Sequence, residues 1–100
     1  MKPPVVTLCG SIKFKQAFID ANYNETMMGN IVLSVGGFGH SEHLNLTEQD
    51  KQMLGDLHKR KIDISDEILV LNVGGYIGKS TEIEIQYARE KGKAVRFLEA

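Results

Sequence analysis

Cysteine, tryptophan and proline are scarce or missing in this chain. One cysteine, two prolines and no tryptophan occur among its 100 residues, and 7% of the residues are aromatic. A single cysteine excludes an internal disulfide and suits a reducing compartment such as the cytoplasm. Because the length is typical of one domain and 42% of the residues are apolar, we expect residues 1–100 to form one domain around one small core.

The chain also lacks long apolar runs and an excess of one charge. No stretch approaches the roughly 18 apolar residues of a membrane span, and no basic-then-apolar leader opens the chain. The net charge of −1 argues against a nucleic acid polymer or an anionic membrane as partner. These features predict a soluble cytoplasmic protein. Because a chain of this size buries only about two-thirds of its unfolded surface, we expect a homodimer or a higher homo-oligomer.

Short apolar runs alternate with segments of helical periodicity. Strands are expected over residues 5–9, 30–35, 67–73 and 94–98. Helices are expected over residues 13–23, from the capping-box-like residues 47–50 onward, and over residues 80–92. This order predicts a small doubly wound α/β domain of the Rossmann or flavodoxin type. Its mainly parallel four-stranded sheet has the expected order 2-1-3-4, with helices on both faces.

Apolar spacing indicates which helix faces meet the sheet. Ser11 is expected to cap the first helix. The apolar face of that helix holds Phe14, Ala17, Phe18 and Ala21, and the stripe of the second helix holds Met53, Leu54 and Leu57. Asp66, just before the third strand, is interpreted as structural because it lies at the end of the sheet away from the expected site.

Ligands of such sheets bind beyond the carboxyl ends of the strands, at the switch point between strands 1 and 3. Three loops leave those ends, over residues 9–12, 36–43 and 72–80. We expect them to supply the substrate contacts, namely Cys9, Gly10, Ser11, Ile12, His40, Gly75, Tyr76, Gly78 and Ser80. Backbone N–H groups of the third loop can hold an anion or a sugar hydroxyl, and a plain turn with Ser80 as helix cap is the simpler alternative.

Glu84 falls on the apolar side of the third helix. At about 100° per residue it lies in the middle of an arc formed by Ile83, Ile85, Tyr87 and Ala88. A carboxylate aimed at the core costs several kcal/mol unless it is paired, hydrogen-bonded or protonated, which makes it a candidate for chemistry. It is either a nucleophile that attacks an anomeric carbon or a first-turn carboxylate that favours the helix dipole.

Other motifs give weaker signals. The stretch from Gly74 does not match a phosphate-binding loop, because Val73 stands where the first glycine is needed. His40 and His43 are a weak ligand pair, so no metal or other cofactor is expected. His58 is either a half-buried structural histidine or a proton donor or orienting group in the cleft. Cys9 is expected to be a small buried residue at a strand end.

Three segments carry a family resemblance that covers nearly the whole chain. They are L-C-G-S-I from Leu8, D-E-I-L-V-L-N from Asp66, and S-T-E-I-E-I-Q-Y-A from Ser80 followed by G-K-A-V. Together they resemble the nucleoside 2-deoxyribosyltransferase family, including the 2'-deoxynucleoside 5'-phosphate N-hydrolases. The resemblance implies that Glu84 is the nucleophile, that Gly10 and Ser11 approach the sugar or its 5' substituent, and that Gly78 lies near the deoxyribose.

The chain departs from the family at three positions. His58 stands where the family usually carries an Asp that helps to handle the proton on the base. Gln86 replaces a glycine, and Gly78 replaces a residue that is often polar. The leading hypothesis is an enzyme that cleaves or transfers the N-glycosidic bond of a (deoxy)nucleoside or nucleotide. A covalent glycosyl–Glu84 intermediate would form, with His58 or His40 assisting the leaving base.

The departure at His58 favours an alternative hypothesis. The chain would then be a non-catalytic nucleotide- or nucleotide-sugar-binding module that keeps the cleft and has lost the chemistry. Both hypotheses give the same partner, a small-molecule nucleoside or nucleotide, and neither needs a cofactor.

Overall fold

Four parallel strands form a single sheet in the order β2-β1-β3-β4. The computed structural model describes residues 2–37 and 45–100. Within these ranges the strands are β1 (Val5–Cys9), β2 (Ile31–Leu33), β3 (Glu67–Val70) and β4 (Ala94–Phe97). The order and the parallel pairing confirm the predicted fold class.

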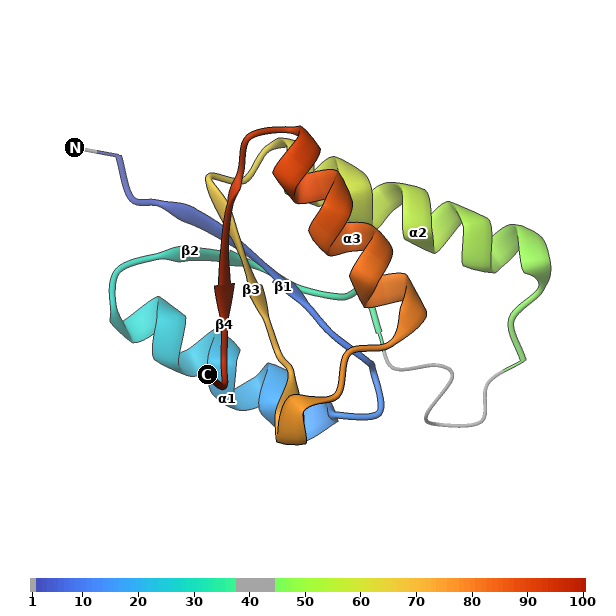
Figure 1. Cartoon of the computed structure of the whole chain (residues 1–100), viewed down its shortest axis with the longest axis horizontal. Helices are drawn as coiled ribbons and strands as arrows, with labels where there is room; N and C mark the ends of the chain where they lie inside the picture. The colour runs from blue at the N-terminus through green and yellow to red at the C-terminus, as the bar shows by residue number, and fades with distance from the viewer. Residues whose placement is uncertain (1, 38–44) are drawn as a thin grey trace.

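Helices cover both faces of the sheet (Figure 1). They are α1 (Lys15–Met27), α2 (Glu48–Asp63) and α3 (Lys79–Glu90), and a short 3-10 turn, η1 (Val73–Gly75), follows β3. Figure 1 shows α1 on one side of the sheet and α2 and α3 together on the other. None of the helices in the described ranges has both the length and the apolar character that a membrane span requires.

The sheet divides the core into two clusters. Alternate side chains of a strand point to opposite faces, so β1 and β3 each contribute to both clusters. One cluster lies under α1 and contains Val6, Leu8, Phe18, Ala21, Leu69 and Leu71. The other lies under α2 and α3 and contains Cys9, Ile62, Ile68, Val70, Ile85 and Ala88. Cys9 thus faces the same side of the sheet as the third helix.

The first helix begins later than predicted, and Ser11 does not cap it. Phe14 is the N-cap residue and makes no side-chain capping bond. Its amide donates to the carbonyl of Ser11 over 3.0 Å, so a turn precedes the helix. The carboxyl end lies at Met27 rather than near residue 23, since the first residue with a left-handed conformation is Gly29, with φ of 92°.

The predicted stripe of the second helix is wrong as a core contact. Met53, Leu54 and Leu57 are 53%, 40% and 48% exposed, and the buried residues of α2 are His58 and Ile62. The amino half of α2 extends past the sheet (Figure 1), so only its carboxyl half meets the core. The capping box is confirmed, because Thr47 Oγ1 accepts from the Asp50 amide and Asp50 Oδ2 accepts from the Thr47 amide, each over 3.0 Å.

The third helix is rotated relative to the prediction. Thr81, Ile85 and Ala88 form its buried face, while Ile83 is 49% exposed. Glu84 therefore lies at the edge of the buried face and not in its middle. Gly78 is the N-cap residue, so the alternative in which Ser80 caps the helix is wrong, whereas Gly92 follows the helix end as predicted, with φ of 72°.

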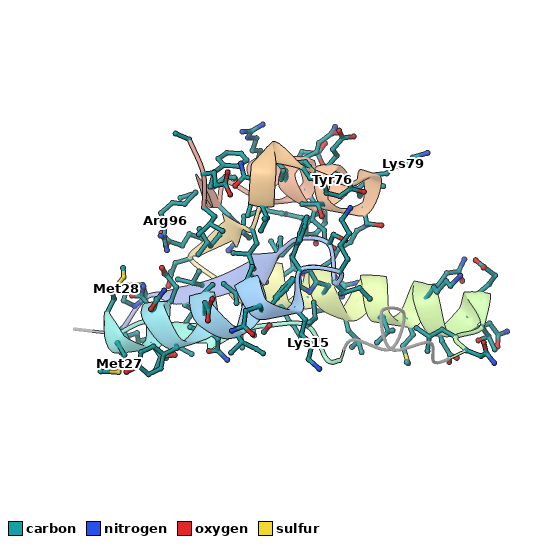
Figure 2. The ribbon with its side chains drawn as sticks, turned by 90° about the horizontal axis from the view of Figure 1, so that it is seen from below. Lys15, Met27, Met28, Tyr76, Lys79 and Arg96 are labelled. Carbon is teal, nitrogen blue, oxygen red and sulfur yellow. The ribbon has the colours of Figure 1, made fainter. Side chains whose placement is uncertain are left out.

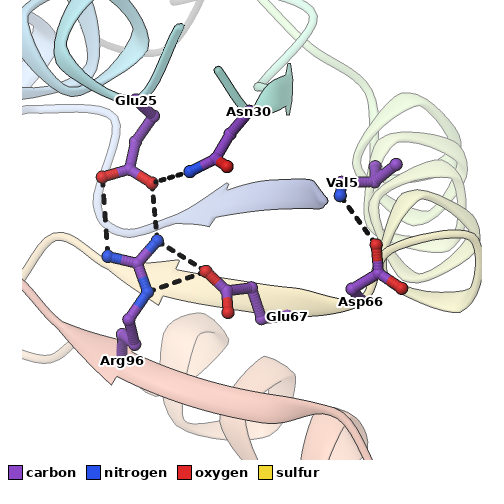
Figure 3. Close-up of polar contacts among 6 residues, drawn as sticks. All are labelled: Val5, Glu25, Asn30, Asp66, Glu67 and Arg96. Atoms are coloured by element: carbon purple, nitrogen blue, oxygen red, sulfur yellow. Dashed lines mark hydrogen bonds and ion pairs between the residues drawn. The ribbon is translucent and has the colours of Figure 1, made fainter. Parts of the chain in front are cut away.

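An ion-pair network fixes the end of the sheet at which β3 begins (Figure 3). The Arg96 guanidinium lies 2.5 Å from a Glu25 carboxylate oxygen and 2.6 Å from Glu67 Oε1. These hydrogen bonds hold the pKa of Glu25 below its usual range. Asp66 Oδ2 accepts from the Val5 amide over 2.7 Å, which confirms its structural role. The network joins α1, β3 and β4 away from the carboxyl ends of the strands.

Candidate functional site

A cleft of about 690 Å³ opens beyond the carboxyl ends of β1, β2 and β3. Its walls come from the segments that follow these strands, from one face of α2 and from the first turns of α3. This is the switch-point position where doubly wound sheets bind ligands, and the volume lies within the range of small-molecule sites. A smaller hollow of about 410 Å³ between α3 and β4 includes neither His58 nor Glu84, so the larger cleft is the candidate site.

Most of the predicted contact residues meet in this cleft. Those that line it are Gly10, Ser11, Ile12, Tyr76, Gly78 and Ser80, together with His58 and Glu84. Cys9 is fully buried and lies beneath the wall rather than in it. Gly75 belongs to the exposed turn η1 and is not part of the wall. His40 lies outside the described residues.

Cys9, His58 and Glu84 form a compact polar cluster at the cleft. His58 Nε2 lies 3.4 Å from Cys9 Sγ and 3.8 Å from Glu84 Oε1. One carboxylate oxygen of Glu84, Cys9 Sγ and a ring nitrogen of His58 all lie within 4.8 Å of one another. The three side chains come from β1, α2 and α3, so tertiary structure alone brings them together.

Burial decides the ionisation of this cluster. It raises the pKa of Glu84 to about 7, against the smaller opposing effects of the Cys9 hydrogen bond and the Lys59 charge. It lowers the pKa of His58 to about 4, and the charge of Lys61 acts in the same direction. Burial also raises the pKa of the Cys9 thiol well above its usual value. At neutral pH His58 is therefore uncharged, so its contact with the partly ionised Glu84 is not an ion pair.

Glu84 remains reachable from the cleft although it is mostly buried. Its side chain is 18% exposed and that of His58 is 9% exposed. Both residues line the cleft wall. The carboxyl group can therefore meet a ligand while the surrounding protein keeps most water away from it.

Three lysines contribute to the cleft wall, and the sequence prediction missed them. They are Lys51 and Lys61 on α2 and Lys79 at the start of α3. Lys61 Nζ donates to the carbonyl of Ser34, which ties α2 to the segment after β2. Residues three or four positions apart share one face of a helix, so this spacing could have identified the face of α2 that meets the cleft. That face consists of Lys51, Leu54, Gly55, His58 and Lys61.

Tyr76 forms the part of the wall next to the first turn of α3. Its ring packs edge-on against Phe14, with 5.8 Å between the ring centroids. Lys13 Nζ lies 3.6 Å from the centroid of the Tyr76 ring. Figure 2 shows Tyr76 at this end of the molecule and the Lys79 side chain extending outward beyond it. An aromatic ring and a cationic rim therefore lie on the same side of the cleft.

No protein-family model matches the chain, and no curated protein sequence matches it significantly. The resemblance to the nucleoside 2-deoxyribosyltransferase family therefore stays a prediction from the segments around Gly10, Asp66 and Glu84.

Proposed function

We propose that the protein cleaves the N-glycosidic bond of a deoxynucleotide, with Glu84 as the nucleophile. The observation that carries this proposal is a reachable carboxyl group at the switch point of the sheet, with its pKa raised to about 7. A group that titrates near neutral pH is partly ionised and can both attack carbon and leave it. The family resemblance assigns the same role to the same residue.

The reaction would proceed in two displacements. Glu84 attacks C1' of the sugar, so that a carboxylate–C1' bond forms while the C1'–nitrogen bond breaks and the base leaves with the electron pair. Water then attacks C1', which breaks the ester and regenerates the carboxylate. The proton that water gives up balances the proton that the departing base takes up, so the products are the free base and the free sugar phosphate.

His58 would position Glu84 rather than protonate the base. An imidazole whose pKa is lowered to about 4 is uncharged at neutral pH and is a poor proton donor. Its Nε2 lies 3.4 Å from Cys9 Sγ and 3.8 Å from Glu84 Oε1, so the ring packs beside the carboxyl group and limits its orientations. The leaving base would receive its proton from water in the cleft.

The cationic wall favours a substrate that carries phosphate. Lys51, Lys61 and Lys79 line the cleft, and Glu84 is the acidic residue of its wall in the part of the chain that the structure describes. Lys79, Ser80 and Thr81 at the start of α3 also line the cleft, and the amino end of a helix favours an anion. A nucleoside 5'-monophosphate therefore fits this wall better than an uncharged nucleoside.

The deciding experiment compares Glu84→Gln with Glu82→Gln. Glu82 is an exposed carboxylate in the first turn of the same helix and lies outside the cleft wall, so it is a matched control. We expect Glu84→Gln to lose at least about 100-fold in the rate of base release from deoxynucleoside monophosphates, because removal of a nucleophile costs far more than one hydrogen bond. Chromatography of the released base measures the rate. Base release at the parent rate by Glu84→Gln would exclude the assignment.

The low pKa of His58 also favours a second candidate, a nucleotide-binding module without catalysis. A cleft of this kind would keep its affinity and lack proton transfer to the base. In that case deoxynucleotides would raise the melting temperature of the protein, and no free base would appear after prolonged incubation.

We further propose that the chain acts as a homodimer in a reducing cytoplasm. Met53, Leu54 and Leu57 leave apolar surface uncovered on α2, and Leu54 and Leu57 continue into the cleft wall. A second copy on this face would cover that surface and lie at the rim of the cleft.

A further inference from the structure

The cluster beneath the cleft combines three different metal-binding groups. Cys9 offers a sulfur, His58 a ring nitrogen and Glu84 a carboxylate oxygen, and these atoms all lie within 4.8 Å of one another. Catalysis by Glu84 as a nucleophile makes no use of a buried thiol at this position. The cluster can therefore serve a purpose beyond the proposed reaction.

The distances in the cluster suit a tetrahedral zinc site. With Zn–S of about 2.3 Å and Zn–N of about 2.0 Å, tetrahedral coordination places the sulfur and the nitrogen roughly 3.5 Å apart. Cys9 Sγ and His58 Nε2 lie 3.4 Å apart. Glu84 Oε1 lies 3.8 Å from His58 Nε2. Its flexible side chain can move the oxygen a few tenths of an ångström closer, which would make it the third ligand of the ion.

The surroundings of the cluster also resemble those of a metal site. A histidine ligand usually donates its other ring N–H to a carbonyl or a carboxylate, which fixes its orientation. The backbone of Leu8, next to Cys9 in β1, acts on His58 in this way, because it raises the pKa of the imidazole against the larger effect of burial. Since His58 and Glu84 line the cleft, the fourth coordination position would open toward it, where water or a ligand oxygen could bind.

The donor set selects the kind of ion. Thiolate and imidazole favour zinc over the hard cations Mg²⁺ and Ca²⁺, which prefer oxygen ligands. One thiolate and one carboxylate also balance the two positive charges of the ion, so the buried site would carry no net charge. We propose that Cys9, His58 and Glu84 bind Zn²⁺, with one position open to the cleft.

Binding forms Zn–S, Zn–N and Zn–O bonds, and the thiol proton leaves to solvent together with the carboxyl proton of those molecules in which Glu84 is protonated. The Glu84 oxygen that would attack C1' then binds the ion instead. As a consequence that rests on the proposed function, Zn²⁺ would inhibit base release reversibly, and a chelator would restore it.

Cobalt provides a spectroscopic test that does not depend on activity. Co²⁺ is added to the chelator-treated full chain, and tetrahedral coordination gives intense visible bands while a thiolate ligand adds a near-ultraviolet charge-transfer band. Because Cys9 is the single cysteine of the chain, that band reports this residue alone. We expect the band in the parent protein, its loss when Zn²⁺ is added, and its absence in Cys9→Ser.

Zinc affinity is then compared among variants by competition with a chromophoric chelator. Cys9→Ser and Glu84→Gln should weaken binding by more than about 100-fold, beyond the roughly 10–100-fold loss expected for an outer-shell partner. The double substitution of His40 and His43 by alanine is the control and should keep the charge-transfer band. Circular dichroism checks that every variant is folded.

Two results would overturn the proposal. One is a parent protein that shows no charge-transfer band at saturating Co²⁺, and the other is equal zinc affinity in the parent and in folded Cys9→Ser. The two proposals also fail separately. A cobalt–thiolate band together with no base release by the metal-free protein would contradict the glycosidic reaction and support the zinc site. Base release together with no cobalt–thiolate band would support the reaction and contradict the zinc site.

Discussion

Burial acts in opposite directions on the two titratable side chains of the cleft wall. The pKa of Glu84 rises from 4.5 to about 7, and that of His58 falls from 6.5 to about 4. In the folded protein both groups are therefore held in their neutral forms. Between pH 4.5 and 6.5 the folded chain binds more protons than the unfolded chain at Glu84 and fewer at His58. The two contributions to the pH dependence of stability oppose each other in this range.

Substituting either Glu84 or His58 should reveal how the other residue makes the free energy of unfolding depend on pH. In Glu84→Gln the remaining His58 should make the free energy of unfolding fall as the pH drops from 6.5 to 4. In His58→Gln the remaining Glu84 should make it fall as the pH rises from 4.5 to 7. Each shift corresponds to about 3 kcal/mol over its full range. Urea unfolding at stepped pH, with a chelator present, measures both slopes.

The difference in the free energy of unfolding between each variant and the parent protein removes every shared contribution, including those of Glu25 and Asp63, whose pKa values are lowered. It leaves the contribution of the substituted group alone, so it should rise from pH 4.5 to 7 for Glu84→Gln and fall from pH 4 to 6.5 for His58→Gln. Glu82→Gln, on the exposed face of α3, should show a flat difference over the same range. A flat difference for Glu84→Gln as well would mean that this carboxyl group is not desolvated in the folded protein.

The sequence allowed prediction of single residues only through local periodicity. Helical spacing identified Glu84, although it placed this residue in the middle of the apolar arc and counted Ile83, which is exposed, as part of that arc. Spacing could not show that Cys9 meets His58, since these residues are 49 positions apart and come together through the packing of α2 on β1. For the same reason the sequence pattern indicates only the neighbouring His40 and His43 as a ligand pair, and not the mixed cluster of Cys9, His58 and Glu84.

At the scale of elements, a substitution can test the close packing of Gly10, which follows β1, against Leu71, which follows β3. A Cβ at Gly10 would lie 3.1 Å from Leu71 Cβ and 3.2 Å from the Leu71 carbonyl oxygen, so one of the two segments must move. We expect Gly10→Ala to lower the free energy of unfolding by about 1–3 kcal/mol, as overpacking does elsewhere. Chemical denaturation followed by circular dichroism measures the loss.

Gly55, within α2, is the matched glycine for comparison. A Cβ there meets no atom within 4 Å, and the residue lies in the interior of a helix. Gly55→Ala should therefore raise stability by roughly 0.5–1 kcal/mol, because alanine has the better helix propensity. If both substitutions changed stability by the same amount and sign, the close approach of Gly10 to Leu71 would not matter.

Helix ends and helix faces were predicted with unequal success, for a physical reason. The capping box at Thr47 is a local interaction between a side chain and the nearby backbone, so four residues of sequence suffice to predict it. The stripe of Met53, Leu54 and Leu57 is a real apolar face, but a sequence pattern does not say what covers it. In the described chain the sheet ends before this part of α2, and the stripe remains exposed.

At the scale of the whole molecule, the fold followed from very few rules. Apolar strands that alternate with helices predict a parallel sheet, and right-handed crossovers limit the possible strand orders. The observed order β2-β1-β3-β4 places the segments after β1 and β2 beside the start of α3. The position of the cleft could therefore be predicted from topology, while its cationic wall depends on which face of α2 turns inward.

The exposed stripe of α2 gives the last prediction, which concerns assembly. If a second copy covers this face, Met53→Lys should place a charge in the contact of both subunits. The loss of two buried methionines at about 1.5 kcal/mol each corresponds to roughly 100-fold weaker dimerisation.

Met27→Lys is the control, because Met27 is 68% exposed at the far end of α1 (Figure 2). Sedimentation equilibrium should show a dimer for the parent protein and for Met27→Lys, and a monomer for Met53→Lys at the same concentration. A monomeric parent protein would contradict the homodimer, and a dimer that survives Met53→Lys unchanged would locate the contact elsewhere.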